Sequence, residues 1–598
     1  MFTPIAPGVE LFHDTCNVYV LHDGGDAVLV DFGSGDVLEH LSKLGVSRLT
    51  DVLVTHHHRD QVQGLARAVD AGARVWVPPH EHELIAGVNA RWEMRQLDND
   101  YDLRQDRYSL LEQVPVAGVV AEYRTRAYGA VEAYVLPTPG HTVGSVTYLV
   151  ERGGERLAFS GDLVHGDGKV WSLAATQWSY SGIEGLAATN FSCGVLAGHA
   201  PDRLLPSHGE PVDDPPSTLG RVRGRLEELA RMRLEDPWRL GDMFDHPWAE
   251  LSPHLLRNRT SFANSYALLS EEGGAVLIDF GYEVSTGLTP VTEHTARRPL
   301  LWAIEALKRD HGVRRVDAVV VTHYHDDHVA GLNLLREIEG TEVWAPANVA
   351  PILEEPHRYD LPCLWHEPIP VDRVLALEGS TSWQEYELAV YALPGHTRFA
   401  AAIGFEVDGR RVLATGDQQT TGGDTSILNY QYRNRYRVGD FVRSAELYRE
   451  LRPDLLLGGH WPPTEVTDAY LDQLLADSQR LEDLHRELLP EEPELGAEGF
   501  VARIEPYRST LRTNESLQLD VVVRNPFARS VAASVRLVVP AGWPQPEPEL
   551  RELAAGAEET IGFLVTAGGA ARRARVAADI TLGETRFGQE AEALVDVE

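Results

Sequence analysis

Short apolar runs separated by turn residues recur along the first 490 residues and predict buried strands. Residues 17–21 and 27–30 lie on either side of a Gly-Gly turn, and so do residues 264–268 and 275–278. Two stretches of this length around such a turn predict a hairpin. Another apolar run, residues 318–321, leads directly into a cluster of histidines.

Helical stretches close two long segments of the chain. The pattern predicts one helix from about residue 215 to 233 and a second from about 467 to 489.

The apolar and polar pattern of the first 235 residues returns in the next 255. Leu136-Pro-Thr-Pro-Gly-His141 matches Leu393-Pro-Gly-His396, and the spacing from this histidine to a Gly-Asp motif is 21 positions in both copies. The following histidine comes 46 positions later in the first copy and 43 in the second. A period near 250 residues indicates a tandem duplication of one domain. We expect domains at residues 1–235 and 236–490, with a connector at about 236–253.

After residue 490 the pattern changes to short strand-like runs. Residues 517–523, 533–539, 560–565 and 575–582 are such runs, separated by Asn-Pro, Pro-Ala-Gly and Gly-Gly breakers. Residues 491–598 are therefore predicted to form a small all-β sandwich.

Composition and charge limit the classes of function. The formal charge is −36, from 54 Lys and Arg against 90 Asp and Glu, and such a surface repels nucleic-acid phosphates. No apolar run is long enough to span a membrane, and three cysteines provide no disulfide framework. We expect a cytoplasmic, bacterial protein that acts on a small molecule and binds neither nucleic acid nor membrane. A homodimer is compatible with this expectation.

The second copy concentrates groups that can bind metal. His323, His325, Asp327 and His328 lie within six residues, directly after an apolar strand, and His396, Asp417 and His460 each follow another strand. Loops at strand ends can direct all seven side chains to one sheet edge. Imidazole and carboxylate ligands without thiolate suit Zn²⁺, Fe or Mn²⁺, and seven groups are too many for one tetrahedral ion. Two metals sharing a bridging carboxylate are therefore predicted.

These residues resemble the metallo-β-lactamase superfamily, whose His-x-His-x-Asp-His signature is present in full at residues 323–328. The resemblance covers residues 1 to about 485 and implies an α/β fold with two tandem αββα sandwich domains, followed here by an immunoglobulin-like sandwich. It implies that His323, His325 and His396 bind one metal, that Asp327, His328 and His460 bind the other, and that Asp417 bridges them. Asp327 would also orient or deprotonate the nucleophilic water.

The first copy departs from the signature at one position. Gln61 stands where the superfamily has its second-metal histidine, while His56, His58 and His141 keep a complete three-histidine site. Asp60, the bridging Asp162 and His208 remain for a second ion, which an amide oxygen would hold less tightly than imidazole does. We expect two Zn²⁺ in the second domain and one or two metal ions in the first, with Asp60 as the catalytic counterpart of Asp327.

Aromatic and arginine side chains follow the Gly-Asp motif in both copies and could line the mouth of each site. Tyr432, Arg433 and Tyr436 in the second copy, and Trp178 and Tyr180 in the first, are candidate substrate contacts, as is Arg398. An Arg-rich rim could hold a carboxylate or phosphate. The alternative, that these aromatic residues pack into the core, is about equally favoured.

The leading function is a metallo-hydrolase whose metal-bound hydroxide cleaves an ester, thioester, lactone, amide or phosphoester, with the main activity in the second domain. One alternative is an iron-dependent oxidoreductase similar to the superfamily's sulfur dioxygenase. The other is a binding or scaffold protein with a degenerate first domain.

Overall fold

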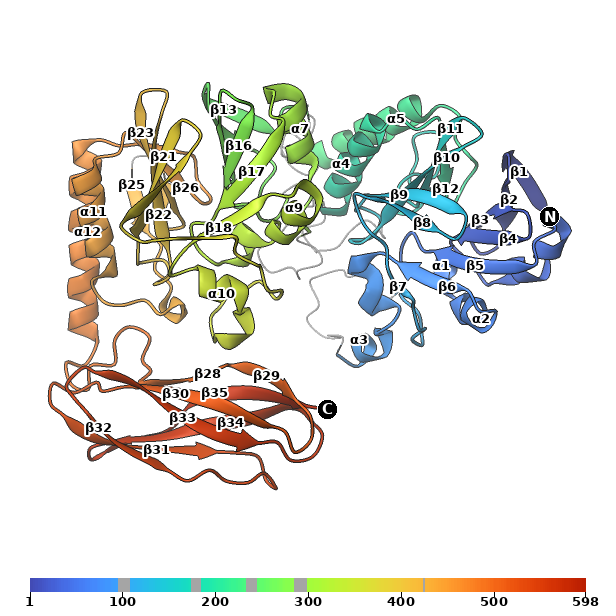
Figure 1. Cartoon of the computed structure of the whole chain (residues 1–598). Helices are drawn as coiled ribbons and strands as arrows, with labels where there is room; N and C mark the ends of the chain where they lie inside the picture. The colour runs from blue at the N-terminus through green and yellow to red at the C-terminus, as the bar shows by residue number, and fades with distance from the viewer. Residues whose placement is uncertain (95–107, 174–183, 233–242, 244, 284–297, 423–424) are drawn as a thin grey trace. The chain divides into compact units, whose positions relative to one another are not determined.

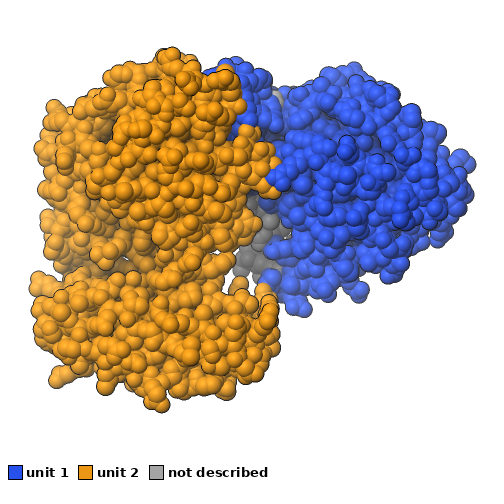
Figure 2. Space-filling view, viewed as in Figure 1, with its two compact units in different colours: residues 1–249, 259–262, 282–311 blue, residues 250–258, 263–281, 312–598 orange. Residues whose placement is uncertain are grey.

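The structure is a computed structural model that describes residues 1–94, 108–173, 184–232, 243, 245–283, 298–422 and 425–598 (Figure 1). The chain forms two compact units (Figure 2). The first contains residues 1–249, 259–262 and 282–311, and the second contains residues 250–258, 263–281 and 312–598. Residues 282–311, expected in the second domain, thus belong to the first unit, and the terminal sandwich belongs to the second.

The first domain is built on two sheets. Its seven-stranded sheet follows chain order: β1 (Phe2–Ala6), β2 (Val9–His13), β3 (Asn17–Asp23), β4 (Asp26–Val30), β5 (Arg48–Leu53), β6 (Arg74–Val77) and β7 (Gly118–Val119). Its five-stranded sheet has the order β12 (Arg203–Pro206), β11 (Glu155–Gly161), β10 (Val146–Arg152), β9 (Val131–Pro137) and β8 (Thr125–Tyr128). The predicted hairpin at residues 17–30 is the antiparallel pair β3 and β4.

Apolar cores lie on both faces of both sheets. Val28 and Val150 belong to the core between the sheets. Leu65 of α2 (Leu65–Asp70) covers the other face of the first sheet. Helices α4 (Glu184–Gly198) and α5 (Pro215–Arg231) cover the second sheet through Leu196 and Leu219. The predicted αββα order is therefore confirmed.

The second domain repeats this arrangement. Its first sheet follows chain order: β13 (Trp248–Ser252), β14 (Leu255–Asn258), β15 (Tyr266–Leu269), β16 (Gly274–Ile278), β17 (Arg315–Val320), β18 (Glu342–Pro346) and β19 (Arg373–Leu375). Its second sheet has the order β20 (Gly379–Trp383), β21 (Tyr386–Ala392), β22 (Ala401–Val407), β23 (Arg410–Gly416), β26 (Leu455–Gly458) and β27 (Thr464–Glu465). Strand β13 lies inside the stretch expected to be a connector.

Helices also cover the sheets of this domain. Tyr448 of α11 (Asp440–Leu451) and Leu474 of α12 (Asp468–Leu488) pack on the second sheet. Helices α8 (Asp326–Val329), α9 (Leu332–Glu339) and α10 (Ala350–Glu354) belong to the first sheet's half of the domain, where α9 contacts β17 and β18. A small hairpin, β24 (Gln419–Gly422) and β25 (Thr425–Leu428), follows β23. Helix α12 lies within the predicted range 467–489.

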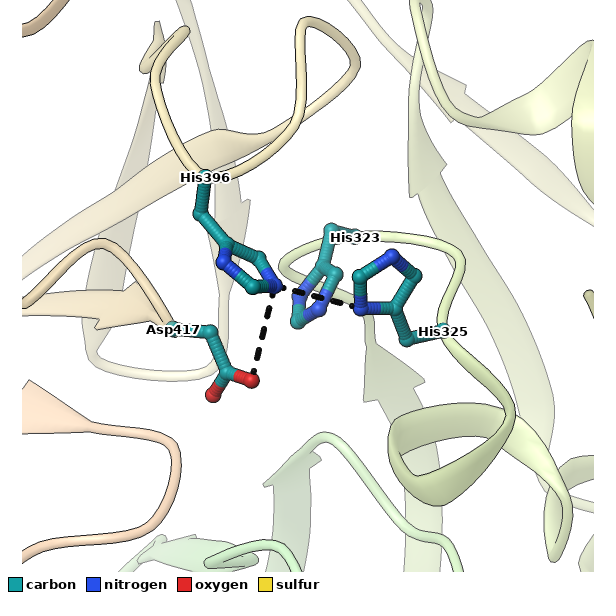
Figure 3. Close-up of side chains that lie close together, drawn as sticks. All are labelled: His323, His325, His396 and Asp417. Carbon is teal, nitrogen blue, oxygen red and sulfur yellow. Dashed lines mark hydrogen bonds and ion pairs between the residues drawn. The ribbon is translucent and has the colours of Figure 1, made fainter. Parts of the chain in front are cut away.

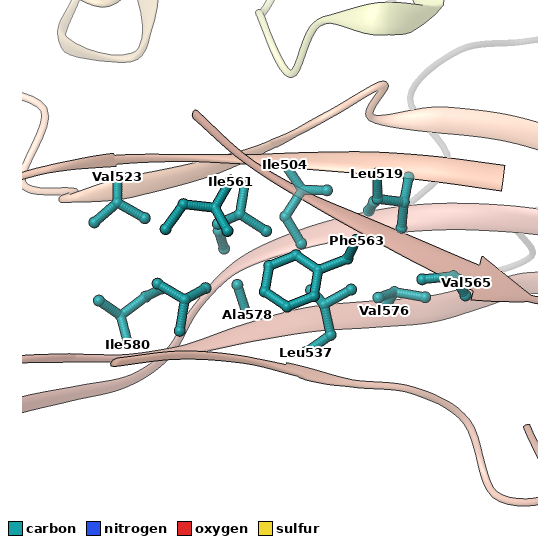
Figure 4. Packing of buried hydrophobic residues seen from close by; sticks show 14 of the residues in the cluster. Ile504, Leu519, Val523, Leu537, Ile561, Phe563, Val565, Val576, Ala578 and Ile580 are labelled. Carbon is teal, nitrogen blue, oxygen red and sulfur yellow. The ribbon is translucent and has the colours of Figure 1, made fainter. Parts of the chain in front are cut away.

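The C-terminal residues form the predicted all-β sandwich. One sheet has the order β28 (Ala502–Glu505), β30 (Ser516–Arg524) and β33 (Glu558–Thr566). The other has the order β29 (Arg508–Leu511), β35 (Thr585–Val597), β34 (Ala571–Leu582), β31 (Val531–Val538) and β32 (Glu549–Leu553). Ile561, Phe563 and Val565 alternate with exposed residues along β33 and face the core that Figure 4 shows.

A buried ion pair joins Arg298 to the first domain. Its guanidinium is paired with Glu122 and donates to the backbone oxygen of Val143 at 3.1 Å, and Arg298 is only 1% exposed. Arg298→Met leaves the Glu122 carboxylate without this partner, so we expect the local stability to fall by about 3–5 kcal/mol. Hydrogen exchange in peptides covering residues 118–137 measures the change.

The matched control for this prediction is Arg48→Met. Arg48 pairs with Asp26 in the same unit, but the two side chains are 68% and 39% exposed. Solvent screens such a surface pair, so its loss should change the stability little. Equal effects of the two substitutions would contradict a special role for the buried pair.

Candidate metal centres

The ligands of the second domain follow strands of both sheets, and not of a single sheet as the sequence predicted. His323 and His325 follow β17, His396 follows β21, Asp417 follows β23 and His460 follows β26. Strands β23 and β26 are parallel, and β21 runs in the same direction because both β21 and β23 are antiparallel to β22. The carboxyl ends of these three strands therefore lie at the same edge of the sheet. His325 is the residue that precedes α8, and the ligands Asp327 and His328 lie within this helix.

Four buried side chains form the first cluster, which Figure 3 shows. His323, His325, His396 and Asp417 each offer one ligand atom, and these atoms lie within 4.8 Å of one another. His396 Nε2 is 3.2 Å from His325 Nδ1 and 3.7 Å from Asp417 Oδ2. The cluster matches the predicted first metal site.

Asp417 also belongs to the second cluster, together with Asp327, His328 and His460. Asp417 Oδ1 is 3.2 Å from His328 Nε2, and Asp417 Oδ2 is 3.3 Å from His460 Nε2. The same His460 nitrogen is 3.1 Å from Asp327 Oδ2. One carboxylate therefore faces both ligand sets, as a bridging group must.

These distances fit metal coordination. Two ligand atoms that are each about 2.1 Å from a tetrahedral zinc ion lie about 3.4 Å apart. His323 Nε2, His328 Nε2 and Asp417 Oδ1 are buried and have no hydrogen-bond partner in the described part of the chain. Buried polar atoms normally have such a partner, and a bound metal ion would take its place here.

Hydrogen bonds behind the ligands set the orientation of the histidine rings. Asp279, the residue after β16, accepts from Thr322 Oγ1 at 2.7 Å and from His328 Nδ1 at 2.8 Å. With Nδ1 engaged, His328 presents Nε2 to the second cluster. His396 Nδ1 likewise donates to the backbone oxygen of Asn429 at 2.8 Å. Such outer partners fix the tautomer of a metal-binding histidine.

The electrostatics of the site favour a positive charge. Burial lowers the pKa of His460, but the carboxylates of Asp417 and Asp327 outweigh it and raise that pKa to about 10. The pKa of His323 shifts in the opposite direction, because burial and the neighbouring His328 hold it well below the usual range. One half of the site therefore provides neutral imidazole, and the other provides anionic oxygen that attracts a cation.

The first domain assembles only one such cluster among its described residues. His56, His58 and His141 converge within 4.8 Å, and His141 Nε2 lies 2.9 Å from His58 Nδ1 and 3.4 Å from Asp162 Oδ2. Within the part of the chain that the structure describes, the buried Nε2 atoms of His56 and His58 have no hydrogen-bond partner. The predicted three-histidine site is thus present in the geometry.

The remaining second-site residues of the first domain bond to one another. His208 Nδ1 is 2.9 Å from Asp162 Oδ1, and its other nitrogen is 3.1 Å from Asp60 Oδ2. In the second domain a single His460 nitrogen faces both carboxylates, whereas in the first the imidazole ring lies between them. Gln61 places its amide nitrogen 3.4 Å from Asp162 Oδ2, and this nitrogen cannot bind a cation. Its buried amide oxygen has no hydrogen-bond partner among the described residues.

A glycine explains part of this difference between the copies. At Gly459, a Cβ atom would lie 1.8 Å from Asp417 Oδ1 and 2.8 Å from His328 Cε1. The equivalent first-copy residue is Ser207, which, like Gly459, accepts the backbone N–H of the corresponding asparagine. Ser207 Oγ donates to Asp31 Oδ2, the counterpart of the Asp279 oxygen that accepts from His328. Ser207 therefore occupies the hydrogen-bond acceptor that a histidine at position 61 would need.

The candidate substrate residues are divided between two environments. Arg398 and Arg433 line a groove beside the second domain, and Arg433 also pairs with Asp360 at 3.1 Å. Tyr436 is only 2% exposed and packs with Tyr432 against His485 of α12, so the core-packing alternative holds for this ring. Trp178 and Tyr180 lie outside the described residues.

Several supporting carboxylates were not predicted as site residues. Glu81 is 1% exposed and accepts from the His57 backbone N–H at 2.9 Å and from Thr142 Oγ1 at 2.9 Å, so it joins the two loops that carry the first-domain histidines. The second copy has Val349 at the corresponding place, so the repeat offered no signal for it. Asp279 and its first-copy counterpart could have been found, because the same Asp-Phe-Gly follows a strand in both copies.

Comparisons with known proteins agree with this geometry. The family described as the metallo-beta-lactamase superfamily matches residues 12–209 and 259–460. A hydroxyacylglutathione hydrolase of Fuscovulum blasticum is 30% identical over 244 residues, which are 38% of this chain and 78% of that protein. Another, from Methylobacillus flagellatus, is 29% identical over 30% of this chain and 61% of its own length. The chain thus spans less than two thirds of some of the curated relatives it matches.

Solved structures similar to part of this chain carry the same family name. A metallo-beta-lactamase family protein from Thermus thermophilus is 21% identical, with 40% of this chain and 88% of that chain covered and a TM-score of 0.31. A Cronobacter sakazakii metallo-beta-lactamase with a HARLDQ motif is 17% identical, with coverages of 40% and 100% and a TM-score of 0.31. No helix among the described residues is long and apolar enough to cross a membrane.

Proposed function

Since the chain belongs to the metallo-β-lactamase superfamily, we propose that its second domain is a zinc-dependent hydrolase that cleaves a thioester or ester bond in a small molecule. The observation that carries this proposal is the convergence of seven ligand side chains in that domain, with Asp417 shared by both clusters. The names of the relatives favour thioesters, because a hydroxyacylglutathione carries its acyl group on sulfur.

Two divalent ions in such a site supply a nucleophile at neutral pH and polarise the scissile carbonyl. The residues of the chain prepare the site for this chemistry. Asp417 directs one carboxylate oxygen to each side of the second cluster, and Asp279 holds His328 in the required tautomer. Asp327 Oδ2 is an acceptor at the less buried side of the site, and we assign it the proton of the attacking water.

The first domain has a different part in this proposal. Its three histidines can bind one ion, while His208 and Gln61 occupy the remaining ligand positions through hydrogen bonds. We assign it a mononuclear site without the main activity. The net charge of −36 favours a small-molecule substrate over nucleic acid.

Metal removal tests the proposal. Dialysis of the full chain against a chelator is expected to abolish release of thiol from an S-acetyl thioester, and added Zn²⁺ is expected to restore it, because the proposed reaction needs metal ions to activate water. Elemental mass spectrometry of protein purified without added metal supplies the stoichiometry. Hydrolysis that persists in metal-free protein would refute the proposal, and predominant iron with oxygen consumption would favour the oxidoreductase alternative.

A further inference from the structure

The second unit contains a groove that the metal centres do not use. The cavity measures about 690 Å³ and lies between the second domain and the terminal sandwich. Arg398, Phe399, Arg433 and residues 435–438 contribute to the wall from the second domain. Phe500, Arg503, Glu558 and Glu592 are among the residues that the sandwich contributes.

Half of the carboxylates of the groove already have an arginine partner. Glu558 receives both terminal nitrogens of Arg503, at 3.1 and 3.2 Å. Glu494 accepts from Arg524 at 2.6 Å, and Asp360 accepts from Arg433 at 3.1 Å. Burial raises the pKa of Glu498 and of Glu590. Three of the six carboxylates that line the groove are therefore paired within its wall.

Two arginines of the second-domain wall lack a hydrogen-bond partner for the guanidinium among the described residues. The side chain of Arg398 makes neither a hydrogen bond nor an ion pair there, although its backbone N–H donates to Asn434. Arg435 is only 13% exposed, and its nearest carboxylate oxygen, of Glu505, is 3.8 Å away. A guanidinium without hydrogen-bond acceptors is expected to bind a carboxylate or phosphate favourably, because the anion supplies the acceptors that are missing.

Side-chain contacts connect these arginines to the first metal cluster. The Asn434 side chain donates to the backbone oxygen of His396 at 3.0 Å and accepts from Tyr324, which stands between His323 and His325. The ring of Phe399 lies 6.2 Å from that of Tyr324 and 5.6 Å from the Arg435 guanidinium. One aromatic side chain thus separates the groove from the residue beside the ligands.

We propose that this groove binds the carboxylate or phosphate of a substrate whose acyl bond is cleaved at the second-domain metal centre, with Arg398 and Arg435 as the anion ligands. The inference rests on the proposed function and narrows the substrate to an anionic thioester or ester. In such a substrate, the charged group is separated from the scissile bond by more than the length of one side chain. The terminal sandwich then acts as one wall of the substrate site.

The test compares two S-acetyl thioesters on the metal-loaded full chain. One is made from a long-chain ω-mercapto carboxylic acid and the other from the primary amide of the same acid, which has the same length but no charge. We expect kcat/KM to be about tenfold higher for the carboxylate, since a charge-assisted hydrogen bond has this magnitude. Arg398→Gln and Arg435→Gln are expected to remove most of this preference, mainly through KM.

Arg536→Gln is the matched control. Arg536 belongs to the sandwich, is half exposed and pairs with Asp579 outside the groove, so the preference should survive its replacement. Equal kcat/KM for the two thioesters in the unsubstituted protein, or a preference unchanged by Arg398→Gln, would overturn the inference while the hydrolase proposal stands.

If neither thioester is hydrolysed, the proposed function fails and the groove is judged by binding alone. Equilibrium dialysis with radiolabelled inorganic phosphate then compares Arg398→Gln with Arg536→Gln. Affinity lost only in Arg398→Gln supports an anion site in the groove, and equal or absent binding in the two variants refutes it.

Discussion

Asp417→Asn is expected to lower thioester hydrolysis by more than about 100-fold. The substitution keeps the size of the side chain but replaces one oxygen with an amide nitrogen, which donates hydrogen bonds and does not bind a cation. Both Asp417 oxygens face ligand clusters, so whichever oxygen is replaced, one ion loses an anionic ligand. Substitution of residues that only support metal ligands typically lowers metal affinity or activity by about 10–100-fold. Loss of a bridging ligand should lower the activity further.

The matched change in the first copy is Asp162→Asn. Asp162 occupies the same position after β11 but bonds to His208 and Gln61. We expect Asp162→Asn to lower the activity far less than Asp417→Asn does. Thiol release and metal content per chain are measured for both variants. A larger loss in Asp162→Asn than in Asp417→Asn would place the activity in the first domain.

The double substitution Gln61→His with Ser207→Gly is expected to raise the metal content by about one ion per chain. The new histidine restores an imidazole nitrogen, and removal of the Ser207 side chain frees the Asp31 oxygen that must orient it. Loss of the serine Cβ also opens the space that Gly459 leaves around Asp417 in the second copy. Elemental mass spectrometry of the purified full chain measures the gain.

Gln61→His alone is the control for this prediction. Ser207 continues to occupy Asp31 in that variant, so the introduced ring lacks its outer hydrogen bond and should bind the second ion at least about 10-fold less tightly than in the double variant. Equal metal content in the single and double variants would show that Ser207 has no part in the difference between the domains.

Most of the ligand set could be predicted because it depends on local pattern. An apolar strand that ends in His-x-His-x-Asp-His, repeated with nearly constant spacing, places its ligands at a strand end wherever the strand lies in the sheet. Strands β21, β23 and β26 run in the same direction and bring His396, Asp417 and His460 to the same edge. The terminal sandwich was equally predictable, since alternation such as that of Ile561 and Phe563 follows from the period of a strand.

Other features depend on contacts between residues that are distant in sequence. Glu81 joins two ligand loops in one copy only, and Arg298 pairs with Glu122, 176 positions away. The packing of Tyr436 on α12 was one of two open alternatives, because an aromatic residue after a Gly-Asp motif can face either the site or the core.

The sequence by itself determined that this chain carries two copies of one metal-binding domain and a β-sandwich, and that the second copy has the complete ligand set. Periodicity, spacing and ligand chemistry are properties of the residues in order, so they need no coordinates. Only the tertiary structure decided that the first copy's second-site residues bond to one another, that Ser207 occupies the acceptor used by a ligand histidine in the other copy, and that arginines face a groove beside the sandwich. These features depend on contacts between side chains that are distant in sequence. Such contacts decide which polar and charged groups already have a hydrogen-bond or ionic partner and which remain available to a ligand.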